Sequence, residues 1–210
     1  GDVETDVTLR GARVLEASPA FRHHGPGHVQ MTSTTLARSS GADPLIEVLP
    51  GASGALDLVD VTLRDAGGAC MRAQGPNLEL TVNGLLFDGC GDEAAWWRNL
   101  DVVASNLTVG AGSGAGVHLY GVRGSVDGVD ASMHDGAGAS MHVQDIDDDF
   151  RLTDLTLVAG QGTAAFTGGP NRALDVDGVH ITGAPGLDVD DSAGALQNLV
   201  LEGPGTGTAF

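Results

Sequence analysis

The chain of 210 residues contains no lysine, and its 10 basic side chains are all arginines, against 28 acidic residues. The formal net charge at pH 7 is −18. Because phosphate binding requires basic patches, this composition argues against a nucleic-acid partner and against an anionic membrane surface. Glycans, cations and other proteins remain as partners.

Long apolar stretches are also lacking. No run approaches the ~20 residues that a membrane span needs, and the N-terminal residues do not have the pattern of a signal peptide. The chain begins without Met and stops at Thr208-Ala209-Phe210, where a further strand is expected. We therefore expect a mature fragment or an excised piece of a longer protein.

What the chain does have is a motif that recurs every 20 to 26 residues, in which Asp or Asn precedes an apolar–any–apolar triplet. The triplets begin at Val61, Leu85, Leu107, Val129, Leu155, Val179 and Leu199. In four copies the polar residue stands directly before the triplet, and in the other three a single Gly separates them. A fixed period of this length predicts a solenoid.

The apolar positions alternate with a period of two, which is the signature of strands and not of helices. Each repeat holds two or three short alternating stretches separated by turns rich in Gly, of which the chain has 33. Two or three strands per repeat is the layout of a parallel β-helix, in which each coil stacks ~4.8 Å above the last.

With these repeats the chain resembles the right-handed parallel β-helix proteins of the pectate-lyase-like superfamily. The resemblance covers residues 56–210 as regular coils. Residues 1–55 are interpreted as N-terminal coils of the same single domain, with an irregular loop near 19–28. The resemblance implies an all-β solenoid with coils of about 20 to 26 residues, and the binding of polysaccharides along one face.

The recurrent Asp or Asn is interpreted as a corner residue. Its short polar side chain can bond to nearby backbone, and it tolerates the left-handed conformation. Stacked corners would form a ladder of Asp and Asn along the solenoid, which is a structural role.

The chain has only two cysteines, Cys70 and Cys90, which fall on neighbouring coils. Stacking is compatible with a disulfide, although their positions within the two coils are offset by about four residues. Two buried free thiols are the alternative. A disulfide would support a secreted or cell-surface location.

One face of the solenoid is a candidate glycan-binding surface. If the apolar residues of the second strands point inward, their successors form an outward ladder that includes Arg72, Trp97, His118 and His142. Tyr120 and Gln144 lie two residues further along. Planar rings beside amides and charged donors suit sugars. A shift of one residue would bury Trp97 and expose Trp96 instead.

Catalysis is less supported than binding. Lyases of the resembling superfamily use Lys or Arg as the base, but this chain has no Lys and its arginines are scattered. The motif set of polygalacturonase-like hydrolases is also missing, and the pair Asp190-Asp191 is weak evidence in a chain so rich in Asp. If the protein is an enzyme, we expect a polysaccharide lyase or a glycoside hydrolase.

Two acidic clusters are candidate calcium sites, because calcium takes six to eight oxygen ligands. The clusters are Asp145, Asp147, Asp148 and Asp149, and Asp188, Asp190 and Asp191. The alternative is ordinary negative surface charge.

An Asp-rich composition without Lys resembles that of proteins from salt-loving microbes, archaea in particular. Together with the regular repeats, it favours a structural, adhesive or filament-forming module of a secreted or cell-surface protein. Its partner would be a glycan, another surface protein or a second copy stacked end to end. A polysaccharide-binding or polysaccharide-cleaving protein is the alternative.

Overall fold

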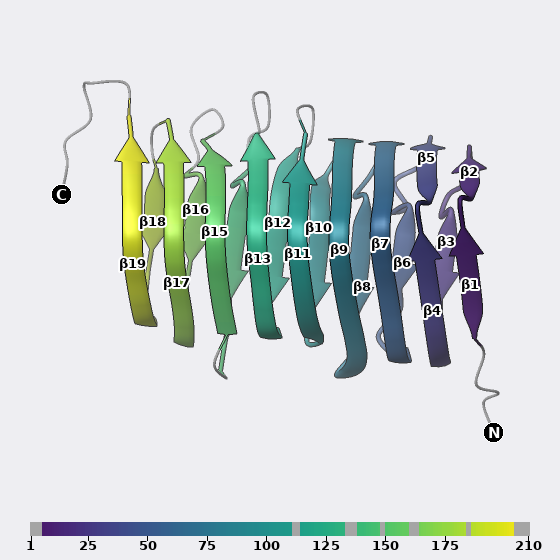
Figure 1. Cartoon of the computed structure of the whole chain (residues 1–210), viewed down its shortest axis with the longest axis horizontal. Coiled ribbons are helices and arrows are strands. Elements are labelled where there is room, and N and C mark those ends of the chain that lie inside the picture. The colour runs from purple at the N-terminus through teal and green to yellow at the C-terminus, as the bar shows by residue number, and fades with distance from the viewer. Residues whose placement is uncertain are drawn as a thin grey trace.

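The computed structural model describes residues 6–110, 114–132, 138–147, 150–159, 164–183 and 186–203. In these ranges the chain forms two parallel β-sheets wound into a solenoid, so the predicted all-β parallel solenoid is confirmed. Figure 1 shows one sheet in front of the other, with the first and last strands at opposite ends. The described residues contain no helix long and apolar enough to cross a membrane.

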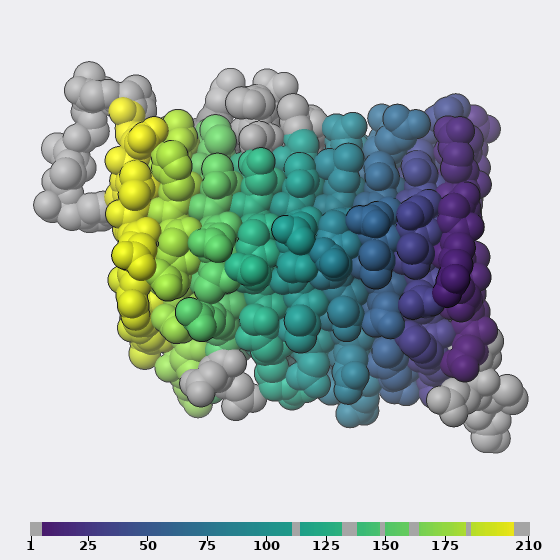
Figure 2. All heavy atoms as spheres, in the orientation of Figure 1, coloured from purple at the N-terminus to yellow at the C-terminus, as the bar shows by residue number. Residues whose placement is uncertain are grey.

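In the described residues, sheet A has 11 strands. Nine of them follow the order β1-β4-β7-β9-β11-β13-β15-β17-β19, and the other two are β2, which pairs with β5, and β5, which also pairs with β7. The strands are β1 (Val7–Arg10), β2 (Arg13–Leu15), β4 (Pro26–Thr32), β5 (Thr35–Ser39), β7 (Ser53–Ala66), β9 (Asn77–Cys90), β11 (Asp101–Val109), β13 (Arg123–Ser132), β15 (Phe150–Val158), β17 (Asn171–Thr182) and β19 (Ser192–Glu202). Seen from outside, sheet A forms a continuous banded surface from one end of the molecule to the other (Figure 2).

Sheet B has eight strands in the order β18-β16-β14-β12-β10-β8-β6-β3. They are β3 (Phe21–His23), β6 (Ile46–Val48), β8 (Met71–Gln74), β10 (Glu93–Arg98), β12 (Ala115–Tyr120), β14 (Met141–Gln144), β16 (Phe166–Gly168) and β18 (Leu187–Val189). The core lies between the two sheets, where the inward residues of successive coils stack into apolar ladders.

Two stretches of each repeat that the alternation predicts as separate strands are one long strand in sheet A. In β9, for example, Leu78 and Leu85 both point into the core, with a bend at Gly84 between them. The strand continues because hydrogen bonding to the neighbouring coils resumes on both sides of the bend.

The bend explains the sequence motif. A residue with positive φ occupies it in every coil of sheet A, and these residues are Gly11, Ser33, Asp60, Gly84, Asn106, Gly128, Asp154, Gly178 and Asn198. Where Asp or Asn directly precedes the triplet, it takes the left-handed position itself. Where a Gly intervenes, the Gly takes that position. The expected structural role of the corner is thereby confirmed for the described coils.

The Asp and Asn residues that precede a Gly also bond to the next coil. The side-chain amide of Asn106 donates to Oδ1 of Asn83 at 3.0 Å, and that of Asn198 donates to Oδ1 of Asp177 at 2.6 Å. These bonds run along the solenoid axis and fix the height of one corner above the next.

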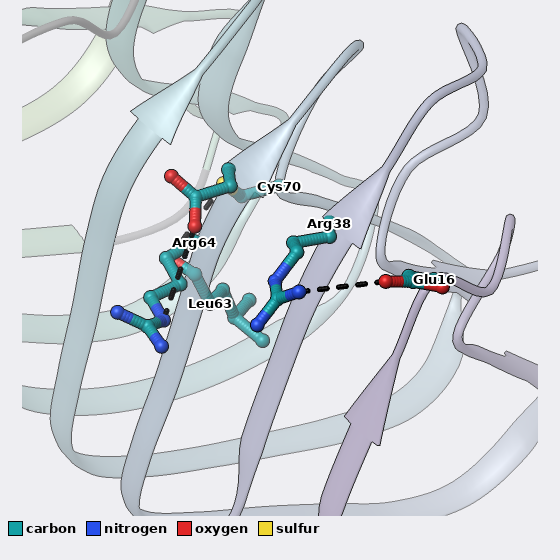
Figure 3. A network of polar contacts seen from close by, with 6 residues as sticks. Glu16, Arg38, Leu63, Arg64 and Cys70 are labelled. Atoms are coloured by element: carbon teal, nitrogen blue, oxygen red, sulfur yellow. Dashed lines mark hydrogen bonds and ion pairs between the residues drawn. The ribbon is translucent and has the colours of Figure 1, made fainter.

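A second left-handed corner lies at the end of the sheet A strands in the N-terminal coils, at Glu16 just after β2 and at Arg38, Asp65 and Gly89 one residue before the ends of β5, β7 and β9. Nη1 of Arg38 lies 3.4 Å from Oε1 of Glu16, an ion pair between neighbouring coils (Figure 3). In the same view, the sulfur of Cys70 packs 3.8 Å from the carbonyl oxygen of Leu63.

The structure contains a disulfide between Cys70 and Cys90, whose Cα atoms are 5.4 Å apart. Both cysteines are buried. Cys90 ends β9 directly above Ala66 of β7, and Cys70 follows the short turn after Ala66. Cys70 lies four residues after Ala66, which is the residue in register with Cys90. The turn at residues 67–69 folds back and brings Cys70 next to Cys90, although the two cysteines are offset by four residues in the repeat.

The expectation of an irregular loop near residues 19–28 is wrong for residues 21–23, which form β3, and for residues 26–28, which begin β4. Phe21 and His23 stack on Ile46 and Val48 of the next coil. β3 is not recognisable in the sequence because it has only three residues and is followed by His24 and Gly25.

Candidate functional site

The outward face of sheet B carries one continuous ladder. Its members, in register from coil to coil, are Arg22, Glu47, Arg72, Trp96, His118, His142, Thr167 and Asp188. The predicted residues Arg72, His118 and His142 therefore belong to one ladder. Tyr120 and Gln144 stand side by side in a second row two residues further along.

The expectation that Trp97 faces outward is wrong. Trp97 is 0% exposed and stacks between Ala73 and Leu119 inside the core. The small side chain of Ala73 on the neighbouring coil leaves room in the core for the indole of Trp97. Trp96 takes the outward place, and Arg98 the place beside Tyr120.

The outward rings form a cluster across β10, β12 and β14. The ring centroids of Trp96 and Tyr120 are 5.9 Å apart, and those of Tyr120 and His142 are 5.3 Å apart. His118 completes the cluster at 5.5 Å from His142. The guanidinium carbon of Arg98 lies 5.9 Å from the centroid of the Trp96 ring, within the range of a cation–π contact.

Hydrogen bonds hold His142 in place. Its Nδ1 lies 2.7 Å from the hydroxyl of Thr167, and its Nε2 lies 3.3 Å from Oε1 of Gln144. The amide nitrogen of Gln144 donates to Oδ2 of Asp145 at 3.3 Å, so its oxygen is left to accept from the imidazole. Both ring nitrogens of His142 therefore have a hydrogen-bond partner, which fixes the ring against the cluster.

The pKa of His118 is lowered to about 4. Burial is the main cause, the neighbouring imidazole of His142 acts in the same direction, and Asp92 opposes the shift. The pKa of Tyr120 is raised, chiefly by burial. At neutral pH the side chains of His118 and Tyr120 are therefore uncharged.

Carboxylates border the ring cluster at the side of β8. Nη2 of Arg72 lies 2.8 Å from Oδ2 of Asp92 and 3.2 Å from Oε2 of Glu93. Burial and the nearby Glu93 raise the pKa of Asp92. Arg72 is thus held by two carboxylates.

On the other side the ring cluster opens into a groove of about 380 Å³. It is lined by His142, Gln144, Thr167, Gly168, Gly169, Pro170, Asp188, Asp190 and Asp191. Part of the predicted glycan face and one predicted acidic cluster therefore form a single site. The sequence did not link them, because the groove arises where the coil turns at Gly169 and Pro170.

The other acidic cluster lies apart from this groove. Asp145 and Asp147 line a separate hollow of about 230 Å³, and Oδ1 of Asp147 lies 3.5 Å from Nε of Arg172. Asp148 and Asp149 lie outside the described residues. Within the described ranges, no three His, Cys, Asp or Glu side chains gather closely enough to hold a metal ion. Calcium binding stays a prediction.

Comparison with protein-family models, curated proteins and solved structures finds no significant match to this chain. Because a solenoid of one shape serves many activities, function must be argued from the site itself.

Proposed function

We propose that this protein is a glycan-binding β-helix module that holds a sugar chain against the outward face of sheet B. The observation that carries the proposal is the ring cluster of Trp96, His118, Tyr120 and His142, which continues into a polar groove. A sugar ring has an apolar face that stacks on aromatic rings and a rim of hydroxyls that bond to amides and carboxylates. The resemblance to polysaccharide-binding β-helices leads to the same function.

The charges of the site favour a neutral glycan. Among the described residues, the groove is lined by Asp188, Asp190 and Asp191, by the imidazole of His142 and by no Arg. The chain as a whole carries a net charge of −18. A polyuronate would be repelled by these carboxylates, whereas the hydroxyls of a neutral sugar would donate hydrogen bonds to them.

We propose binding without cleavage. Among the arginines that a lyase could use as a base, Arg72 is paired with Asp92 and Glu93, and Arg98 stacks on Trp96. Arg123 donates to Oδ1 of Asp101 at 2.5 Å. Each of these guanidinium groups is engaged by a neighbouring side chain, which favours an adhesive role over an enzymatic one.

A secreted or cell-surface location is part of the proposal. The buried disulfide supports it, because disulfides persist in oxidising compartments. The acidic, lysine-free surface supports a salty environment.

The test is a panel of neutral and acidic polysaccharides, with retention and chain cleavage both measured in high salt. We expect retention on a neutral polysaccharide without cleavage. Trp96→Ala should weaken this binding about tenfold, since it removes one stacking platform. His142→Ala should weaken it similarly.

His180→Ala is the matched control for His142→Ala, because His180 lies on the outward face of sheet A. It should bind like the wild type. Equal loss in both variants, or no retention on any polysaccharide, would refute the proposal. Cleavage by the wild type would instead make the protein an enzyme.

A further inference from the structure

We propose that copies of this chain stack head to tail, with the last described coil of one copy lying on the first coil of the next. The tail consists of β18 and β19, and the head consists of β1, β2 and β3. These elements lie at the two ends of the solenoid (Figures 1 and 2). The proposal is independent of glycan binding.

The tail presents apolar side chains at positions that the coils between the two ends bury. Leu196, Leu199 and Leu201 are 46%, 36% and 43% exposed. The residues one coil below them are Val176, Val179 and Ile181, which are 1%, 3% and 0% exposed. A further coil on top would remove this apolar surface from water.

The head has matching apolar side chains. Val7, Leu9, Val14 and Phe21 pack against the core from one side and remain partly exposed on the other. Extending the observed register by one coil sets Leu9 above Leu196 and Val14 above Leu201 in sheet A. In sheet B it sets Phe21 above Leu187. The core ladders therefore continue across the junction.

The charges of the two ends are complementary. Residues 6–24 of the head include Arg10, Arg13 and Arg22 against only Asp6 and Glu16. The described residues of the tail, 187–203, have no Arg or Lys, and their acidic residues are Asp188, Asp190, Asp191 and Glu202. Residues 6–24 thus carry three Arg against two acidic residues, whereas residues 187–203 carry four acidic residues and no Arg. In a chain with a net charge of −18, this contrast makes a second copy the fitting occupant of the acidic tail.

One pair in particular specifies the register. Arg22 already lies 2.6 Å from Glu47, which stands in register with Arg72. In the stacked arrangement Asp188 of one copy meets Arg22 of the next. The outward ladder of sheet B would then alternate in sign across the junction, from Asp188 through Arg22 and Glu47 to Arg72.

The backbone supports the same arrangement. β1 and β3 end their sheets on one side, and β19 and β18 end them on the other. The free edges of such strands present backbone N–H and C=O groups that can pair with another chain. Because the head and tail are different surfaces, the contact does not close on itself and leads to a filament.

The test exchanges charges at the two ends. Arg22→Asp makes both ends acidic, and Asp188→Arg makes both ends basic at this position, so each variant alone repels itself. Sedimentation velocity over a concentration series should show each variant associating about tenfold more weakly than the wild type. An equimolar mixture of the two should regain association, because every alternating junction then joins Asp to Arg.

Both substituted residues are exposed, Arg22 at 51% of its side chain, so folding should be preserved. Arg151→Asp and Asp130→Arg make the same charge changes on the outward face of sheet A, and they should associate like the wild type. A wild type that remains monomeric at every concentration would overturn the proposal. So would variants that associate normally alone, or a mixture that associates no better than its components.

Discussion

At the scale of single residues, side-chain volume and solvation decide the site more than the pattern of polarity does. The segment Ala94-Ala95-Trp96-Trp97 has no alternation, so the sequence alone permits either tryptophan to face outward. The structure buries Trp97 because the stacked neighbour Ala73 is small. His118 and His142 were predictable because each is flanked by apolar residues, and Tyr120 because it continues the alternation after Leu119.

His118 allows a prediction about pH. Its pKa is about 4 in the folded protein and about 6.5 in an unfolded chain. Protonation therefore favours the unfolded state, and stability is lost as the pH falls from 6.5 to 4. Allowing for partial solvent screening, we expect His118 to account for about 2 kcal/mol of this loss.

Urea unfolding at a series of pH values would measure this loss. His118→Gln removes the titrating group, and its free energy of unfolding should fall less than that of the wild type over the same pH range. Parallel curves for the two proteins would show that His118 does not contribute.

At the scale of the elements, the repeat was predictable because every coil of sheet A needs a residue with positive φ at the same place. Only Gly, Asn, Asp or, in one early coil, Ser fills it, and this leaves a visible period in the sequence. The merging of two stretches into one strand was not predictable, because it depends on hydrogen bonds to coils that are distant in the sequence. The groove was not predictable from the repeat, and the repeat could not decide between a disulfide and two free thiols, since both features depend on how the turns fold back.

The close approach of β4 and β7 gives a matched pair of glycine variants. A Cβ added at Gly54 would lie 2.1 Å from the backbone oxygen of Gly27, whereas one added at Gly25 meets nothing within 4 Å. Both glycines have similar φ, 98° and 90°. Gly25→Ala should therefore lower the free energy of unfolding by about 1–2 kcal/mol, because of the backbone conformation alone.

Gly54→Ala should lower the free energy of unfolding by about 2 kcal/mol or more beyond the loss expected for Gly25→Ala, because the backbone must move to relieve the overlap. Urea unfolding of both variants, followed by circular dichroism, measures the difference. Equal losses of stability would mean that β4 and β7 do not approach each other as closely as the structure shows.

At the scale of the whole molecule, a single architecture supports both proposals. The ladder of sheet B brings side chains from distant parts of the sequence into one row, and that row carries the rings of the proposed glycan site. The same stacking leaves apolar and oppositely charged surfaces on the first and last described coils. In a filament the outward face of sheet B would repeat along the axis, so many weak glycan contacts would act together.

Net charge opposes this compact state, which leads to a prediction about salt. With 28 acidic and 10 basic residues, self-repulsion should outweigh the exposed ion pairs, each of which contributes only about 0–1 kcal/mol. The Debye length shortens from about 10 Å at 0.1 M salt to about 3 Å at 1 M. Screening should therefore stabilise the fold, and a gain of about 2 kcal/mol would raise the Tm by roughly 4–8 °C.

Thermal unfolding in NaCl from 0.1 to 1 M measures this effect, and choline chloride at equal ionic strength separates screening from specific cation binding. A rise in Tm with both salts supports self-repulsion as the cause. A fall in Tm would mean that ion pairs between coils, such as that of Arg38 with Glu16, outweigh the repulsion. Adding calcium at constant ionic strength extends the experiment to the acidic groove. A further rise that is lost in Asp190→Asn would place a cation among Asp188, Asp190 and Asp191, whereas no rise would leave these carboxylates to bind sugar hydroxyls.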